Sequence, residues 1–166
     1  HFIFPCITML ALVSCNPKEK ETPKLNNILL KEWVGPYGGV PAFDLMKVED
    51  VKTAMLKGME MELNDIAAIV NNTDTPTFEN TIEELERSGA ELKRASNYYG
   101  ILSGNMSSQE FRDIETELAP LFSEHESKIT QNEKLFHRIK TVYDASLENP
   151  LPSDQQRVID LTYKNF

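Results

Sequence analysis

The residues of this chain whose types and spacing come nearest to a hydrolytic site are His125 and Glu126. A helical zinc hydrolase site uses the pattern His-Glu-x-x-His, in which two imidazoles one turn apart bind the metal and the Glu activates a water molecule. Ile129 stands where the second histidine would be, and isoleucine cannot bind a metal. His137 follows without a partner pattern. We therefore interpret His125 as a semi-buried helix residue and predict no catalytic and no metal-binding residue in this chain.

The other candidate groups have simpler structural interpretations. Most of the glutamates are spaced so that they would lie on polar, solvated helix faces: Glu83, Glu84, Glu86, Glu110, Glu115, Glu117, Glu124 and Glu126. Glycines 35, 38 and 39 do not form a phosphate loop, because no strand precedes them and no Gly-Lys-Ser/Thr follows. Four methionines could form a soft peptide-binding surface, but their helical spacing favours the core: Met46, Met55, Met59 and Met61.

The composition suits one domain of ordinary size with a core of its own. The chain has 166 residues, of which 40% are hydrophobic and 26% are charged. Its net charge of -9 argues against a nucleic-acid-binding protein, which would present a basic face to phosphates. The two cysteines, Cys6 and Cys15, both lie near the start, which excludes a disulfide scaffold and a cysteine-ligated zinc site for the rest of the chain.

The first fifteen residues are typical of an export signal. Residues 2–13 are nearly all apolar, yet this run is shorter than the roughly 20 residues that a spanning helix needs. The segment Leu12-Val13-Ser14-Cys15 resembles the lipobox of bacterial lipoproteins, in which the signal is cut before the cysteine and the cysteine is acylated. Cys15 is therefore the predicted lipidation site. The alternative is a buried apolar strand or helix with an incidental cysteine.

This signal predicts how the chain is organised. We expect a lipoprotein signal peptide with a truncated start over residues 1–14, a lipid-anchored polar tether over 15–30, and a helical region over 31–166. The tether rests on the polar run Asn16 to Thr22, where Pro17 within the run and Pro23 after it resist helix formation. Lipid chains would then be the only membrane attachment, on an exported protein that faces the periplasm.

Apolar residues from Val48 onward recur at three- and four-residue steps, which predicts an all-α fold. Helices are expected over about 48–70, 78–102, 111–129, 135–143 and 153–166. Four N-terminal caps are predicted at Thr77 with Asn80, Ser107 with Glu110, Asn132, and Ser153 with Gln156. Two positions interrupt the pattern. Pro120 should kink its helix, and Gly89 either breaks a helix or permits a close neighbour. Because no capping residue follows the last helix, we expect that more protein follows Phe166.

Two stretches resemble the N-terminal region of peptidyl-dipeptidases, also called dipeptidyl carboxypeptidases, which belong to the thimet oligopeptidase family of zinc metallopeptidases. They are NILLKEWVGPYGGVPAFD, residues 27–44, and TPTFENTIEELERSG, residues 75–89. The resemblance extends over about residues 26–166.

The resemblance implies a large, mostly helical fold that is split by a deep channel. Its zinc site lies in the second half of the family's chain, which this sequence does not reach. The resemblance therefore implies a full-length parent that binds zinc and releases dipeptides from the C-termini of short peptides. This chain would form channel wall, bind no zinc itself and act as a monomer.

Two other interpretations remain open. The chain could be a stand-alone lipid-anchored helical bundle that binds peptides or partner proteins, which predicts a stop codon soon after Phe166. It could also be a structural envelope lipoprotein without a ligand, which predicts neither peptide binding nor a continuation.

Overall fold

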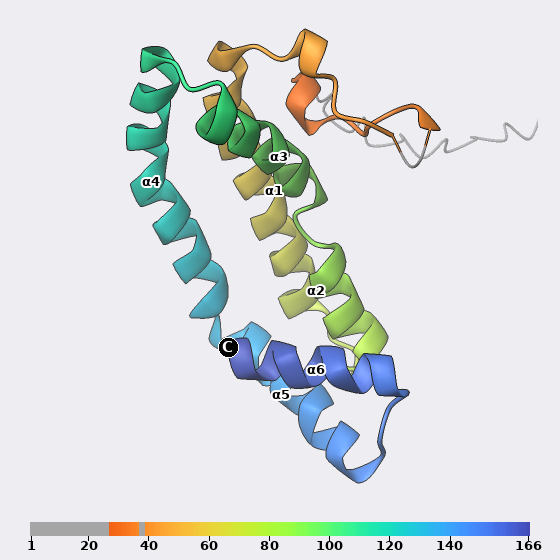
Figure 1. The fold of residues 1–166 in the computed structure, drawn as a ribbon. Helices are drawn as coiled ribbons and strands as arrows, with labels where there is room; N and C mark the ends of the chain where they lie inside the picture. Colours follow the sequence, from red (N-terminus) through yellow and green to blue (C-terminus); the bar gives the residue numbers. More distant parts are fainter. Residues whose placement is uncertain (1–26, 37–38) are drawn as a thin grey trace, which may run out of the picture.

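The computed structural model describes residues 27–36 and 39–166, in which every regular element is helical (Figure 1). The main helices are α1 (Val51–Asn71), α2 (Glu84–Arg87), α3 (Ala90–Asn105), α4 (Gln109–Thr130), α5 (Glu133–Glu148) and α6 (Ser153–Asn165). Shorter elements are η1 (Ile28–Leu30), η3 (Phe43–Leu45), η4 (Val48–Asp50) and a π-helical turn, η5 (Phe78–Glu83). Strand-like pairing in the described ranges is limited to one isolated bridge between Val34 and Val40. The predicted all-α fold is confirmed.

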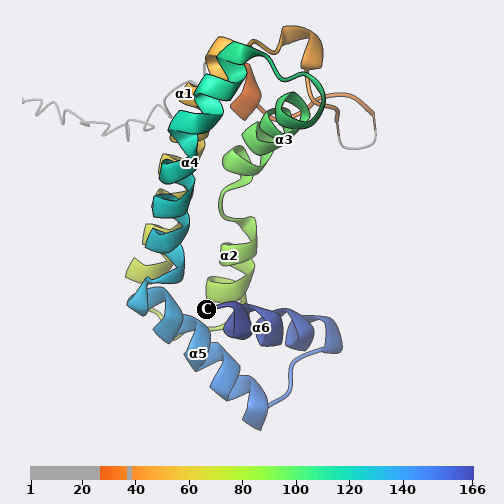
Figure 2. The same ribbon diagram turned by 60° about the vertical axis from the view of Figure 1, so that its left-hand side comes forward.

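The long helices form an elongated layer with a helical hairpin across one end. α1 runs antiparallel to the line made by η5, α2 and α3, and α4 packs along α1 on another side (Figures 1 and 2). α5 and α6 pack on each other and cross the end where α1 finishes and η5 begins (Figure 2). α1 therefore contacts both α3 and α4, which follow it much later in the sequence.

Two separate hydrophobic cores hold this arrangement together. The upper core lies at the start of α1 and contains Leu29, Leu30, Val51, Ala54, Met55, Ala95, Tyr98, Leu102, Phe111 and Leu118. The lower core lies at the end of α1 and contains Ile66, Ile69, Ile82, Leu135, Ile139, Val142 and Ile159. Burial of such side chains is the main driving force for folding, so each core stabilises its own end of the layer.

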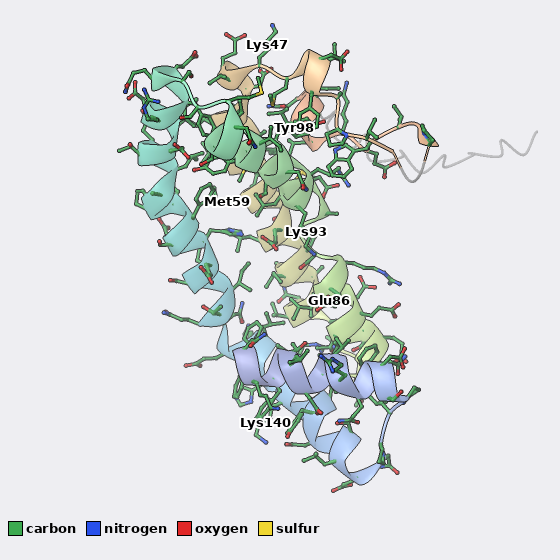
Figure 3. All side chains as sticks on the ribbon, in the orientation of Figure 1. Lys47, Met59, Glu86, Lys93, Tyr98 and Lys140 are labelled. Atoms are coloured by element: carbon green, nitrogen blue, oxygen red, sulfur yellow. The ribbon has the colours of Figure 1, made fainter. Side chains whose placement is uncertain are left out.

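Both cores depend on how α1 is built. Met55 and Met59 are buried on it, which confirms the core interpretation of these two methionines (Figure 3). Between the cores, Gly58 lets α3 approach closely, because a Cβ at this position would lie 2.9 Å from the Cα of Leu92. The glycine thus sets the separation of α1 and α3.

The line from η5 to α3 is broken at Gly89. Its φ of 66° is left-handed, a conformation that favours glycine, and α2 ends just before it. A Cβ on Gly89 would also lie 2.6 Å from the carboxyl carbon of Glu62 on α1. Both alternatives offered by the sequence are therefore correct. Across the break, Lys93 Nζ donates to the carbonyl of Glu86 at 2.9 Å (Figure 3).

Two of the predicted caps are confirmed. Thr77 and Asn80 form a reciprocal capping box, in which the Thr77 hydroxyl accepts from the Asn80 N–H and the Asn80 Oδ1 accepts from the Thr77 N–H. The side chain of Asn132 accepts from the N–H of Leu135 at the start of α5.

The other two caps were predicted wrongly. α4 is capped by Ser108, whose hydroxyl accepts from Phe111 N–H, so the helix begins one residue later than predicted. α6 follows Pro152, and Ser153 is already its first helical residue. The Gln156 side chain accepts from the Leu151 N–H at 3.3 Å, whereas the predicted capping box required it to accept from the Ser153 N–H.

α4 continues without interruption through Pro120. A proline inside a helix cannot donate to the carbonyl four residues earlier, here that of Thr116. Pro120 and Thr116 are both exposed, so water can replace the missing partner. The hydrogen bond that Pro120 cannot form is therefore missing on the solvent-exposed face of α4.

The packed part of the chain begins earlier than the predicted tether allowed. Leu29 and Leu30 were assigned to the tether, but they are 0% and 1% exposed in the upper core, and Arg94 Nε donates to the Leu30 carbonyl. The tether cannot extend to residue 30, because burial of these leucines outweighs the polar character of their neighbours. Cys15 lies outside the described residues. No helix in the described part of the chain has the length and apolar character needed to cross a membrane.

Candidate functional site

A buried histidine and a half-buried glutamate meet between the two cores. His125 on α4 and Glu62 on α1 are joined by a contact of 2.7 Å between Nε2 and Oε2. Their side chains are only 10% and 18% exposed. The other ring nitrogen of His125, Nδ1, is buried without a hydrogen-bond partner. A proton on Nε2 suits this setting, because it places the N–H at the carboxylate and leaves no buried N–H unpaired.

The same region of α1 also holds the break before α3. Asp65, about one turn beyond Glu62, accepts from the Gly89 N–H at 3.1 Å. Glu62 itself lies against the Gly89 backbone, where a side chain would collide with it. We call Glu62, Asp65, Gly89 and His125 the central polar cluster. It connects α1, α4 and the α2–α3 junction at one place.

The chemistry of this cluster is that of a structural hydrogen-bond network. Zinc sites need three or four ligands, and here one imidazole has a single carboxylate beside it, because Asp65 is bound to a backbone N–H. Within residues 27–36 and 39–166 no group of three or more His, Cys, Asp or Glu is placed to hold a metal. His125 is therefore a packed helix residue, as interpreted from the sequence. His137 is exposed on α5.

The stretch TPTFENT is a folding motif. Asn80 lies at its centre, and beyond the capping box its amide donates to the Thr75 carbonyl at 2.9 Å. The Thr81 hydroxyl donates to Asn80 Oδ1, also at 2.9 Å. The motif thus fixes the turn from the end of α1 into η5.

A buried arginine on α5 completes this turn. Arg138 is 8% exposed, and Nη1 donates to the Asn72 carbonyl at 2.8 Å and the Asp74 carbonyl at 3.3 Å. Its Nη2 donates to Asn80 Oδ1 at 3.0 Å. All three acceptors are uncharged oxygens. Arg138 therefore ties the hairpin of α5 and α6 to the motif.

A cleft of about 550 Å³ lies between the second half of α1 and the η5–α2 segment. Its walls combine apolar, amide and charged side chains: Asp65, Ala68, Ile69, Asn72, Glu79, Asn80, Glu84, Arg87 and Ser88. The Arg87 guanidinium is already paired with Glu83 and Glu84. Carboxylates therefore dominate the unpaired charge of the cleft, which suits a partner with amide and cationic groups.

A second groove, of about 450 Å³, lies on the α3 side of the same junction. It is lined by Glu32, Trp33, Ala90, Lys93, Arg94 and Asn97. Several of its donors are already used, since Arg94 binds the Leu30 carbonyl and Glu91, and Lys93 binds the Glu86 carbonyl. The first cleft is therefore the better candidate for a binding surface.

The chain is similar to known peptidases. It is 27% identical over 140 residues to the dipeptidyl carboxypeptidase of Salmonella typhimurium (strain LT2), an alignment that covers 84% of this chain and 20% of that protein. It is 27% identical over 126 residues to the dipeptidyl carboxypeptidase of Escherichia coli (strain K12), which covers 76% of this chain and 18% of that protein. No family model matches the chain.

These similarities support a relation to peptidases at a coarse level. The chain spans about a fifth of the length of the two relatives, so the activity in their names describes proteins that are much larger. The dipeptidyl carboxypeptidase part of the sequence resemblance is supported. The similarities assign no role to individual residues of this chain.

Sequence reasoning missed Glu62 and Arg138. The partners of both residues lie about sixty positions away in the sequence, so no local motif could show the pairs. A weaker signal was present for Arg138. Its spacing from Leu135 and Val142 places it on the apolar face of α5, where a charged residue needs buried partners.

Proposed function

We propose that this chain is the N-terminal helical region of a zinc-dependent dipeptidyl carboxypeptidase of the thimet oligopeptidase family. The observation that carries the proposal is the alignment of 84% of the chain with a fifth of the dipeptidyl carboxypeptidase from Salmonella typhimurium. The all-helical fold supports it, since the family that the sequence resembles is mostly helical. The parent enzyme would release dipeptides from the C-termini of short peptides.

In this proposal the helices form part of the wall of the substrate channel. The cleft beside α2 is the surface best suited to contact a peptide, because Ala68 and Ile69 supply apolar contacts while Asn72 and Asn80 line it with amides. The role of this region is to bind the peptide chain and to restrict entry to unfolded substrates.

The zinc ion of the parent enzyme would be bound outside this chain. The described residues do not fit a zinc site, because His125 and Glu62 pair with each other and no third ligand stands beside them. Catalysis is accordingly assigned to the remainder of the parent, and zinc binding by this chain alone is not expected.

The proposed location is the outside of a bacterial envelope membrane, facing the periplasm. Acylation of Cys15 would attach the protein, and the polar run that follows would separate the lipid from the first packed residues. No further membrane contact and no nucleic-acid partner are proposed, and the enzyme would act as a monomer.

The complete gene provides the first test. We expect the reading frame to continue beyond Phe166 and to encode His-Glu-x-x-His far downstream. A stop codon directly after Phe166 in the natural gene would refute the proposal.

The purified product of the complete gene provides the second test. With zinc present it should release a C-terminal dipeptide from a short peptide with a free carboxyl terminus, as detected by mass spectrometry. A peptide of the same sequence with an amidated C-terminus is the control and should be cut far more slowly. Equal cleavage of both peptides, or cleavage by the 166-residue chain alone, would contradict the proposal.

One observation favours a second candidate, a stand-alone lipid-anchored helical bundle. Both cores are closed by residues of this chain, and Val51, Phe111, Leu135 and Ile159 are each 0% exposed. A bundle of this kind would bind peptides or proteins without cutting them. The gene test separates the two candidates, since only the second expects the reading frame to end near Phe166.

A further inference from the structure

We propose that Glu62 couples the position of α4 to the cleft beside α2. In this inference, release of α4 from α1 and loosening of the turn at Ser88 and Gly89 occur together, so α4 controls the shape of a cleft that it does not line. The inference rests on the geometry of the central polar cluster and is independent of the proposed function.

α4 has few buried side chains near its C-terminal end, over residues 123–128. Leu118 belongs to the upper core, and Leu121, Phe122 and Ile129 pack partly against the two cores. Between them, every residue from 123 to 128 is exposed except His125. The contact of His125 with Glu62 is therefore what fastens this stretch of α4 to α1.

Glu62 contacts two elements at once. Its carboxylate binds His125 on α4. Its side chain also lies against the Gly89 backbone, so close that any side chain at position 89 would collide with it. If His125 is removed, the Glu62 carboxylate, whose side chain is only 18% exposed, loses its hydrogen-bond partner, which is costly. The Glu62 side chain is then expected to rotate toward water. Its contact with the left-handed turn at Gly89 is lost.

The turn at Ser88 and Gly89 adjoins the cleft. The N–H of Gly89 also donates to Asp65, another residue of α1, and Asp65 lines the cleft. Ser88, the residue before Gly89, lines it as well and is only 5% exposed. A change in the backbone at residues 88–89 therefore moves two walls of the cleft relative to each other.

Coupling of this kind must be reciprocal. If release of α4 loosens the turn, then forcing the turn away from its left-handed shape must loosen α4 by the same free energy. This requirement gives two independent ways to disturb the system, one on α4 and one at Gly89.

Hydrogen–deuterium exchange of the full chain tests the inference. We expect His125→Ala to raise exchange by roughly fivefold or more in residues 123–130 and also in residues 86–91, while residues 135–142 of the lower core change much less. Gly89→Ala should produce the same two faster segments. His137→Ala, which removes an exposed histidine, is the matched control and should change neither segment.

A second variant guards against general loss of stability. The amide of His125→Gln can still donate to Glu62, so this variant should retain slow exchange in residues 86–91. Faster exchange confined to residues 123–130 in His125→Ala would overturn the coupling. Equal acceleration of all segments, or an effect of His125→Gln as large as that of His125→Ala, would also overturn it.

Discussion

Nη2 of Arg138 donates to Oδ1 of Asn80 at 3.0 Å, across 58 positions of the sequence. The same Asn80 oxygen already accepts from the Thr77 N–H at the start of η5. One side-chain oxygen therefore serves both the local cap and the contact with α5. This relationship explains how the turn after α1 is held in register with the lower core.

The buried guanidinium leads to a first prediction. Arg138→Met should lower the free energy of unfolding by about 2–3 kcal/mol, because three partly buried hydrogen bonds from a charged donor are lost. Arg157, on the exposed side of α6, offers a matched control. Arg157→Met should stay within about 0.5 kcal/mol of the parent in the same urea titration. Equal effects of the two substitutions would show that the buried bonds contribute nothing.

The left-handed turn leads to a second prediction. Gly89→Ala should cost at least roughly 1–2 kcal/mol, since the backbone conformation disfavours a Cβ and the new atom meets Glu62. Gly100 has the opposite setting, because it is exposed inside α3 and nothing lies within 4 Å of a Cβ placed there. Gly100→Ala should therefore stabilise the chain by up to about 1 kcal/mol. Thermal melts of both variants would check the signs, and a stabilised Gly89→Ala would be incompatible with the structure.

A third prediction concerns acid. Hydrogen bonds from the backbone N–H of Glu79 and from Thr77 hold the pKa of the Glu79 carboxyl below its ordinary value of 4.5. A lowered pKa in the folded state means stability that is present above the ordinary value and is lost as the pH falls through the folded value. Glu79→Gln should therefore be less stable than the parent at about pH 7 and nearly equal to it at about pH 2. If the difference in stability between Glu79→Gln and the parent is the same at both pH values, the lowered pKa of Glu79 is contradicted.

The fourth prediction tests the lipid anchor. If Cys15 is acylated, cells that express the complete gene with a radioactive fatty acid should label the protein, and Cys15→Ser should abolish the label. Cys6→Ser, which removes the other cysteine of the apolar segment, is the control and should be labelled normally. Loss of the label in neither variant would exclude Cys15 as the site.

The helices were predictable because their apolar spacing is local. The predicted stripe from Val48 to Val70 includes four residues that are buried on α1, but it places Val70 inward where the structure buries Ile69. The predicted stripe from Leu135 to Tyr143 includes the buried Leu135, Ile139 and Val142 of α5. The ends were harder, as Ser108 in place of Ser107 shows. Two adjacent serines offer similar local caps, so the sequence alone does not choose between them.

The candidate site was predictable only in part. The sequence predicted no zinc helix at His125, since the spacing of metal ligands within one helix is a local property, and the structure places His125 against Glu62. It could not show Glu62 or the cleft, because both depend on how α1 faces α4 and α2. Leu29 and Leu30 were wrongly assigned to the tether for a related reason. They adjoin polar residues, and what buries them is a core formed by distant helices.

Trp33 is the one tryptophan of the chain, and it lines the groove where the segment before α1 meets α3. That segment is held further by the Ala42 N–H, which donates to the Tyr98 hydroxyl at 2.8 Å. Indole emission therefore reports on whether this segment is docked, whereas far-ultraviolet circular dichroism reports on the helices as a whole. The chain thus carries a built-in fluorescent probe of one end of the molecule.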